Sequence, residues 1–168
     1  PSLHLGGRTR DDAFALVHDF KERLDPACVP AVTTDGLRSY VYALTAHFGR
    51  WFRPRKARSD HWQTSEDLHY GQLVKHKGKR HATLTYTRMV WGKRQRLFAR
   101  LREIGLRPLI QTAFVERVNL TFRQSVAALS RRTWSYAQSE RHLLLHCEWF
   151  RLYYHLVRAH ESLALQVP

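Results

Sequence analysis

Apolar residues recur at helical spacing in five segments of the chain, and each segment predicts an amphipathic helix. The segments span residues 10–24, 37–48, 88–104, 114–129 and 136–157. Before the first, Thr9 is a suitable N-cap, and Asp11 and Asp12 suit the positive end of the helix dipole. Before the last, Ser135 and Gln138 have the spacing of a capping box.

The last predicted helix is apolar on two sides. One stripe contains Leu143, Cys147, Phe150, Tyr154 and Val157, and the other contains Leu145, Trp149, Leu152 and Leu156. A helix that is apolar around much of its circumference is either buried or in contact with a second chain. We therefore expect tight packing within the chain or a homo-oligomer.

Shorter apolar runs predict strands. Residues 2–5 carry alternating Leu before a Gly-Gly pair, residues 29–34 form an apolar run, and residues 81–87 alternate Thr with apolar side chains. Strands interleaved with helices favour an α/β class. A chain of 168 residues, of which 43% are hydrophobic, suits one domain with a core of its own, and we expect residues 1–168 to form it.

Asp35 stands where the predicted strand at 29–34 gives way to a predicted helix. Open α/β sheets place ligand-binding groups at such junctions. An Asp there can act as a metal ligand, because the strand holds its position while the open edge admits substrate. The alternative is that Asp35 simply caps the helix that follows, as Asp commonly does.

The predicted helix at 114–129 carries one apolar stripe at positions 115, 118, 122, 126 and 129. On a neighbouring face, Glu116, Asn119 and Arg123 form a line, since residues three and four apart stack on a helix. A carboxylate, an amide and a guanidinium in this arrangement suit a metal ion beside a phosphate. The alternative is a solvated face on which Glu116 and Arg123 serve only the helix.

The charge of the chain points to a polyanionic partner. Lys and Arg number 28 against 14 Asp and Glu, which gives a formal net charge of +14 and a pI near 10.6. Basic residues gather in a segment at about 50–108, interleaved with aromatic rings that suit base stacking. The DNA contacts expected there are Arg53, Arg55, Lys56, Arg58, Lys75, Lys77, Lys79, Arg80, Lys93 and Arg94. A solvated loop is the alternative for its first part.

The two cysteines, Cys28 and Cys147, lie far apart and form no zinc-binding pattern, which favours a reducing compartment. No segment approaches the length of a transmembrane helix. We expect a cytoplasmic protein associated with the nucleoid and not with a membrane.

Several segments resemble a known family. Residues 33–36, Thr-Thr-Asp-Gly, resemble the second-aspartate segment of DDE-type insertion-sequence transposases. Residues 115–123, Val-Glu-Arg-Val-Asn-Leu-Thr-Phe-Arg, resemble the glutamate helix of the insertion-sequence-one family, with its ERxNL core and, at 131–133, its Arg-Arg-Thr turn. Residues 158–163 resemble the RPHxSL tail of this class, with Ala159 in place of its Pro.

The resemblance, which covers about residues 2–163, implies a ribonuclease-H-like core with a mixed sheet and flanking helices. It implies that Asp35 and Glu116 are catalytic and hold Mg²⁺ or Mn²⁺, hard cations that prefer carboxylate oxygens. It also implies that Asn119, Arg123, Arg131 and Arg132 contact DNA. The implied activity is cleavage of transposon ends and strand transfer into double-stranded target DNA.

A first catalytic aspartate, expected on a strand before residues 2–5, is not found in this sequence. We therefore expect a domain truncated at its N-terminus and deficient in catalysis. Two alternatives stay open: a DNA-binding remnant without enzymatic activity, and a ribonuclease-H-like nuclease or resolvase that lacks strand transfer.

Overall fold

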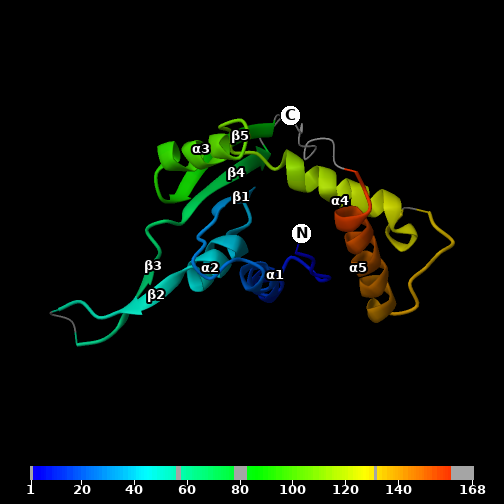
Figure 1. The fold of residues 1–168 in the computed structure, drawn as a ribbon, viewed down its shortest axis with the longest axis horizontal. Coiled ribbons are helices and arrows are strands. Elements are labelled where there is room, and N and C mark those ends of the chain that lie inside the picture. The colour runs from blue at the N-terminus through cyan, green and yellow to red at the C-terminus, as the bar shows by residue number, and fades with distance from the viewer. Residues whose placement is uncertain (1, 56–57, 78–82, 131, 160–168) are drawn as a thin grey trace, which may run out of the picture. The chain divides into compact units, whose positions relative to one another are not determined.

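The computed structural model describes residues 2–55, 58–77, 83–130 and 132–159, and it divides into two compact units (Figure 1). The first unit spans residues 2–113 and the second begins at residue 114. Each unit is described separately below. The single domain expected from the length of the chain stays a prediction.

The first unit is built on a three-stranded mixed sheet with the order β1-β4-β5. Strand β1 (Ala31–Asp35) runs parallel to β4 (His69–Lys77), which pairs antiparallel with β5 (Thr83–Trp91). In register, Thr34 lies beside Gln72, and Gln72 lies beside Arg88, so one row of polar residues crosses all three strands. This architecture confirms the α/β class and a mixed sheet with flanking helices.

Helices cover both faces of this sheet. On one face, α1 (Arg10–Glu22) packs against α2 (Arg38–His47), and their buried Val17 and Leu44 join Tyr70 of β4 in one core. On the other face, Leu97 of α3 (Arg94–Glu103) and Ile110 of the following segment form a second core with Leu73 and Met89. The alternation of side chains along β4 thus feeds two separate cores.

The start of α1 agrees with the predicted capping. The Thr9 side chain accepts a hydrogen bond from the Asp12 amide, and the Asp12 carboxylate accepts one from the Thr9 amide, which completes a capping box. Asp12 also contacts His4, with 2.8 Å between Oδ1 and Nε2. The bonds from Thr9 and His4 lower the pKa of Asp12 to about 2.

Part of the basic segment forms a β-hairpin that the sequence analysis did not predict. Strand β2 (Gly49–Phe52) pairs antiparallel with β3 (His61–Thr64) (Figure 1). The turn between them carries Arg53, Arg55 and Arg58. Trp51 and Trp62 face each other across the pair, with ring centroids 5.5 Å apart. Residues 49–52 and 61–64 are therefore strands and not the solvated loop that was the alternative for this part of the segment.

One expected strand is absent, and the starts of two expected helices are wrong. Residues 2–5 form no strand; His4 in this stretch instead contacts Asp12 of α1. Residues 88–91 belong to β5, and α3 begins only at Arg94, after Gly92 turns the chain at φ +73°. The last helix begins at Glu140 and not at Tyr136, because Ser139, not Ser135, caps it by accepting a hydrogen bond from the His142 amide.

The second unit contains α4 (Ala113–Ser125) from its second residue on, the 3-10 turn η1 (Ala127–Leu129) and α5 (Glu140–Leu156). Its core is small: Phe122 of α4 meets Phe150 of α5 edge to face, with centroids 4.9 Å apart. Val126 and Cys147 are buried nearby, and burial raises the pKa of the Cys147 thiol. The predicted stripe on α4 is buried at positions 122 and 126, but Val115 is exposed.

Only one of the two apolar stripes expected on α5 is buried in part, through Cys147 and Phe150. The other stripe, Leu145, Trp149, Leu152 and Leu156, is exposed. Among the described residues, no helix combines the length and the apolar character needed to cross a bilayer.

The capping box of α1 predicts a pH dependence. Because the pKa of Asp12 is lowered in the folded state, its stabilising contribution is present above about pH 4 and is lost as pH falls towards 2. The difference in free energy of unfolding between the wild type and Asp12→Asn should therefore shrink over this range, as measured by denaturant titrations. Asp11→Asn, which changes an exposed carboxylate in the same turn, is the control; an equal trend for both variants would contradict the assignment.

Candidate functional site

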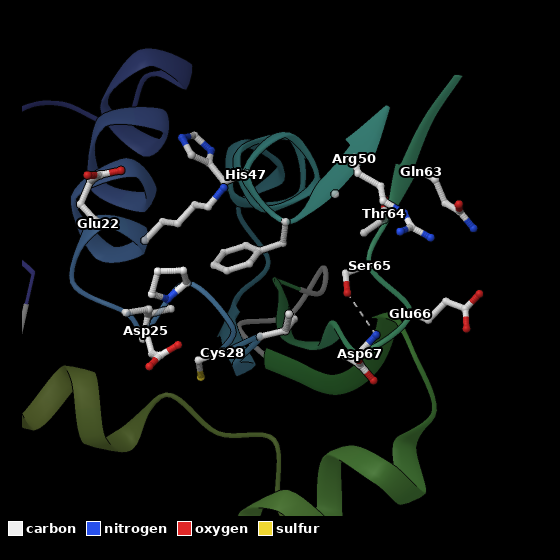
Figure 2. A pocket seen from close by; sticks show the side chains of 16 residues that line it. Glu22, Asp25, Cys28, His47, Arg50, Gln63, Thr64, Ser65, Glu66 and Asp67 are labelled. Carbon is white, nitrogen blue, oxygen red and sulfur yellow. Dashed lines mark hydrogen bonds between the residues drawn. The ribbon is translucent and has the colours of Figure 1, made fainter. Parts of the chain in front are cut away.

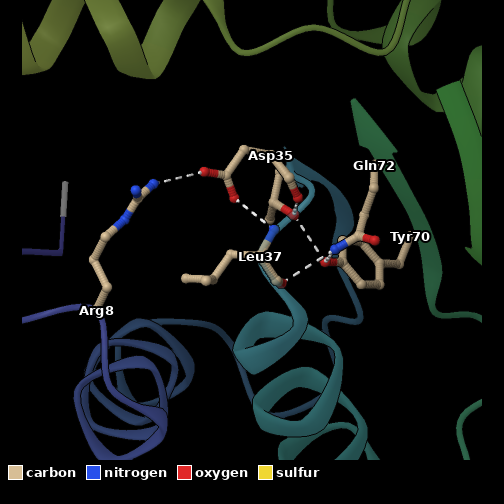
Figure 3. A network of polar contacts seen from close by, with 6 residues as sticks. Arg8, Asp35, Leu37, Tyr70 and Gln72 are labelled. Carbon is tan, nitrogen blue, oxygen red and sulfur yellow. Dashed lines mark hydrogen bonds and ion pairs between the residues drawn. The ribbon is translucent and has the colours of Figure 1, made fainter. Parts of the chain in front are cut away.

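Asp35 is the last residue of β1, at the carboxyl end of the strand that runs parallel to β4. Its Oδ1 atom accepts a hydrogen bond from the Leu37 amide at 3.1 Å, and its Oδ2 atom lies 3.5 Å from the Arg8 guanidinium (Figure 3). The Asp35 side chain is 46% exposed. Asp35 therefore orders the turn before α2 and still offers a carboxylate to solvent. The interpretation of Asp35 as the helix cap is wrong, because the N-cap of α2 is Leu37, which has no side-chain capping bond.

A relay of hydrogen bonds holds the backbone at Asp35. The buried Gln72 amide donates to the Tyr70 hydroxyl at 2.7 Å, and that hydroxyl lies 2.8 Å from the Thr34 hydroxyl. Thr34 donates its single proton to the Asp35 carbonyl at 2.8 Å, so Tyr70 must donate to Thr34. The bonds thus run in one direction, from Gln72 to the end of β1 (Figure 3).

Two further contacts complete this network. The Arg88 guanidinium on β5 donates two hydrogen bonds to the side-chain oxygen Oε1 of Gln72, at 2.9 and 2.6 Å. Gln72 also donates to the Leu37 carbonyl at 3.3 Å. Burial raises the pKa of Tyr70, although its bonds to Thr34 and Gln72 act in the opposite direction. The phenol is thus held neutral, and the network links the third strand of the sheet to the carboxylate at the end of the first.

Glu116, Asn119 and Arg123 lie on α4 and are all exposed. Their placement agrees with the expected polar face of this helix. Asp35 belongs to the first unit and Glu116 to the second, so their action at a common site stays a prediction. Asp11 and Asp12 lie in the first turn of α1, where their role at the helix N-terminus is sufficient to explain them.

The surroundings of Asp35 fit a divalent cation only in part. Asp35 supplies an accessible oxygen of the kind that Mg²⁺ prefers, but the Arg8 guanidinium lies beside it. Within the described parts of the chain, no group of three His, Cys, Asp or Glu side chains is close enough to hold a metal ion. Asp35 therefore fits as one ligand of a site that needs others.

The basic residues expected to bind DNA fall in several places. Arg53, Arg55 and Arg58 are exposed in the turn of the β2–β3 hairpin, where Arg53 contacts Asp60 at 2.7 Å. Lys75 on β4, Lys93 and Arg94 at the start of α3, and Arg132 near η1 are also exposed. The side chains of Lys56, Lys77, Lys79, Arg80 and Arg131 lie outside the described residues, as does most of the tail at 158–163.

A pocket of about 670 Å³ lies between the ends of α1 and α2 and strand β3 (Figure 2). Four carboxylates line it, from Glu22, Asp25, Glu66 and Asp67, together with the cations of Lys21 and Arg50. The excess of carboxylates opposes the binding of phosphate. This hollow is therefore no candidate for contact with DNA, although the chain as a whole is basic.

Sequence reasoning missed Tyr70, Gln72 and Arg88, because the strand that carries the first two was not recognised. The alternation of Tyr70, Gln72 and Val74 with other residues was a signal for that strand, but the surrounding His and Lys residues obscured it.

Comparison of the chain with protein-family models, curated proteins and solved structures found no match.

The relay predicts a stability cost at Tyr70. Tyr70→Phe should lower the free energy of unfolding by about 1–3 kcal/mol, because it leaves the buried Gln72 amide without one of its acceptors. Denaturant titrations measure the change. Tyr86→Phe, which alters an exposed ring on β5, should change stability by less than about 0.5 kcal/mol. Equal effects of the two substitutions would refute the structural role of the relay.

Proposed function

We propose that this chain is the catalytic domain of an insertion-sequence transposase with a ribonuclease-H-like core. Its activity would be the cleavage of transposon ends and their joining to double-stranded target DNA. The observation that carries this proposal is the position of Asp35: an accessible carboxylate at the carboxyl end of a strand, held there by a hydrogen-bonded network. Strand ends of this kind are where open α/β sheets place their functional groups.

Mg²⁺ or Mn²⁺, when bound, supplies an activated attacking oxygen and stabilises the leaving oxygen of the phosphodiester. Asp35 and Glu116 are the residues that would hold it. Their carboxylates have the required chemistry, and both are accessible from solvent. Arg8, whose guanidinium lies 3.5 Å from Asp35, would give way to the cation or turn towards a phosphate.

The β2–β3 hairpin supports DNA as the partner. Its turn presents Arg53, Arg55 and Arg58, and its strand β2 exposes Trp51 and Phe52. Cations that meet phosphates and rings that stack on bases are the two components of nucleic-acid binding surfaces. Asp60 is an acidic residue in this turn, and its exposed pair with Arg53 is worth only about 0–1 kcal/mol.

A second candidate function is DNA binding without catalysis. The lack of a group of three metal-binding side chains among the described residues favours it. In this case Asp35 would serve only as the residue that orders the turn into α2, through its bond with the Leu37 amide.

Paramagnetic Mn²⁺ tests the shared metal site. Bound Mn²⁺ should broaden the amide resonances near both Asp35 and Glu116 in nuclear magnetic resonance spectra of the chain. Asp35→Asn and Glu116→Gln should each remove both effects, because two carboxylates hold the ion together. Asp60→Asn, in the same unit as Asp35, is the control and should leave the broadening unchanged. Broadening near Asp35 that survives Glu116→Gln would exclude a common site.

The two candidate functions differ in cleavage of DNA. In a protein that also carries the first aspartate of the family, a transposase domain should nick supercoiled DNA in the presence of Mg²⁺ or Mn²⁺, and Glu116→Gln should abolish nicking while DNA binding is retained. Binding without nicking in that protein, under conditions where Mn²⁺ occupies the site, would favour the second candidate.

The hairpin predicts a salt dependence of duplex binding. Each lost phosphate contact lowers the slope of log K against log salt by about 0.9, so replacing Arg53, Arg55 and Arg58 with Gln should lower it by about 2–3. Fluorescence anisotropy with a labelled duplex measures the slope. The control replaces Arg100, Arg102 and Arg107, which are exposed on α3 and the segment after it. An unchanged slope in the hairpin variant would remove the hairpin from the interface.

A further inference from the structure

The first unit contains a second pocket, of about 580 Å³, where β3 leads into β4 and β5 leads into α3. Trp62 and Trp91 supply aromatic walls, and His69, Lys93 and Arg96 also line it. Glu66 is an acidic residue at this pocket, against the two cations. Residues separated by up to 34 positions along the chain, from 62 to 96, thus meet in one hollow that combines rings with positive charge.

Both indoles are held by the same residue of α2. The Trp62 Nε1 group donates to the Thr45 carbonyl at 2.7 Å, and the Trp91 Nε1 group donates to the Thr45 hydroxyl at 3.1 Å. Gly49 lets the Trp62 ring lie close, since a Cβ atom at Gly49 would come within 2.7 Å of that ring. The two rings are therefore positioned before any ligand arrives, which lowers the entropy cost of binding to them.

The N-terminus of α3 opens beside these rings. Lys93 is the N-cap, and it makes no side-chain capping bond; the first turn of this described helix also contains no acidic residue. The first amides of a helix lack intrahelical partners and attract anions, above all phosphate. Lys93 and Arg96 are exposed here, whereas Arg94 is turned towards β5, where it donates to the Thr87 hydroxyl at 3.0 Å.

His69 is a further polar group of the pocket. Its side chain is buried, with 5% of the residue exposed, and its Nδ1 atom has no hydrogen-bond partner among the described residues. Gly92 covers this nitrogen without a side chain, because a Cβ atom there would lie 2.4 Å from it. Because Gly92 covers this nitrogen, His69 contributes to the wall of the pocket and is not itself a ligand contact.

We propose that this pocket binds one unpaired nucleotide of a DNA strand. The base lies against Trp62 and Trp91, and its phosphate is received by the first amides of α3 with Lys93 and Arg96. A base within a duplex has both of its faces stacked, so the nucleotide must be unstacked and unpaired to enter. The inference rests on the proposed function in that DNA is the partner. It deepens that function by assigning a place for a single strand at the base of the β2–β3 hairpin.

Anisotropy of a fluorescein-labelled ten-residue oligothymidylate tests the proposal, with a blunt duplex of equal length as the second probe. Trp91→Ala should weaken binding of the single strand about tenfold, in line with the loss of one stacked base, and Trp91→Phe should restore part of it. Lys93→Gln with Arg96→Gln should also weaken it about tenfold at low salt and lower the salt slope. This double variant changes only exposed residues, so it keeps its fold.

Two matched controls belong to the experiment. Trp134→Ala removes an indole that is 97% exposed in the second unit, and Arg100→Gln with Arg102→Gln removes two cations from elsewhere on α3. Both should bind the oligothymidylate as the wild type does. Single-strand affinities that are equal in the pocket variants and the controls would overturn the proposal, while duplex binding would still uphold the proposed function.

Other outcomes are equally decisive. If the wild type binds neither probe, the proposed function fails and the pocket loses its partner. Thymidine monophosphate is added as a competitor at the same molar concentration as the protein. If it then displaces the oligothymidylate, the pocket is a site for free nucleotides, and the assignment to a DNA strand is overturned. Displacement only at far higher concentration supports a strand whose neighbouring phosphates add to the affinity.

Discussion

The first unit depends on the need to satisfy one buried amide. Gln72 is fully buried in the middle strand of the sheet, where a polar group without partners would cost more than a hydrogen bond returns. Arg88 on one side and Tyr70 and Leu37 on the other provide those partners. These bonds join β4 to β5 and to the start of α2, and the Tyr70 hydroxyl extends them to Thr34 of β1, so satisfaction of the amide supports one register of the sheet.

The same network determines the surroundings of Asp35. The relay from Gln72 ends on the Asp35 carbonyl, and the Asp35 carboxylate in turn orders the Leu37 amide. Both ends of this residue are therefore restrained, although its side chain is half exposed. Restraint combined with access is the property that a metal ligand requires. The bond that orders the turn before α2 accounts for the same restraint, so the restraint is compatible with both candidate functions.

The elements that could be predicted from the sequence are those with local signals. Helix α1, with its Thr9 cap, and the junction of β1 with α2 at Asp35 follow from apolar spacing and from capping chemistry. Strands β2, β3 and β4 could not be predicted, since their pattern is interrupted by cations and their pairing depends on distant partners such as Thr34 for Gln72. The strand expected at residues 2–5 fails for the same reason, because alternation without a pairing partner does not make a strand.

The residues of the candidate sites also fall into two groups, those that could be predicted from the sequence and those that could not. Asp35 and the exposed line of Glu116, Asn119 and Arg123 could be located from their positions on elements. The relay behind Asp35 and the aromatic pocket could not, because Tyr70, Trp62 and Trp91 come together only through the sheet.

Thr45 of α2 links the hairpin to the sheet. Its carbonyl accepts a hydrogen bond from Trp62 of β3, and its hydroxyl accepts one from Trp91 of β5. One residue of a helix therefore sets the positions of two aromatic rings that lie on different sheets. A substitution at Thr45 would thus disturb both walls of the aromatic pocket together, although Thr45 itself does not line that pocket.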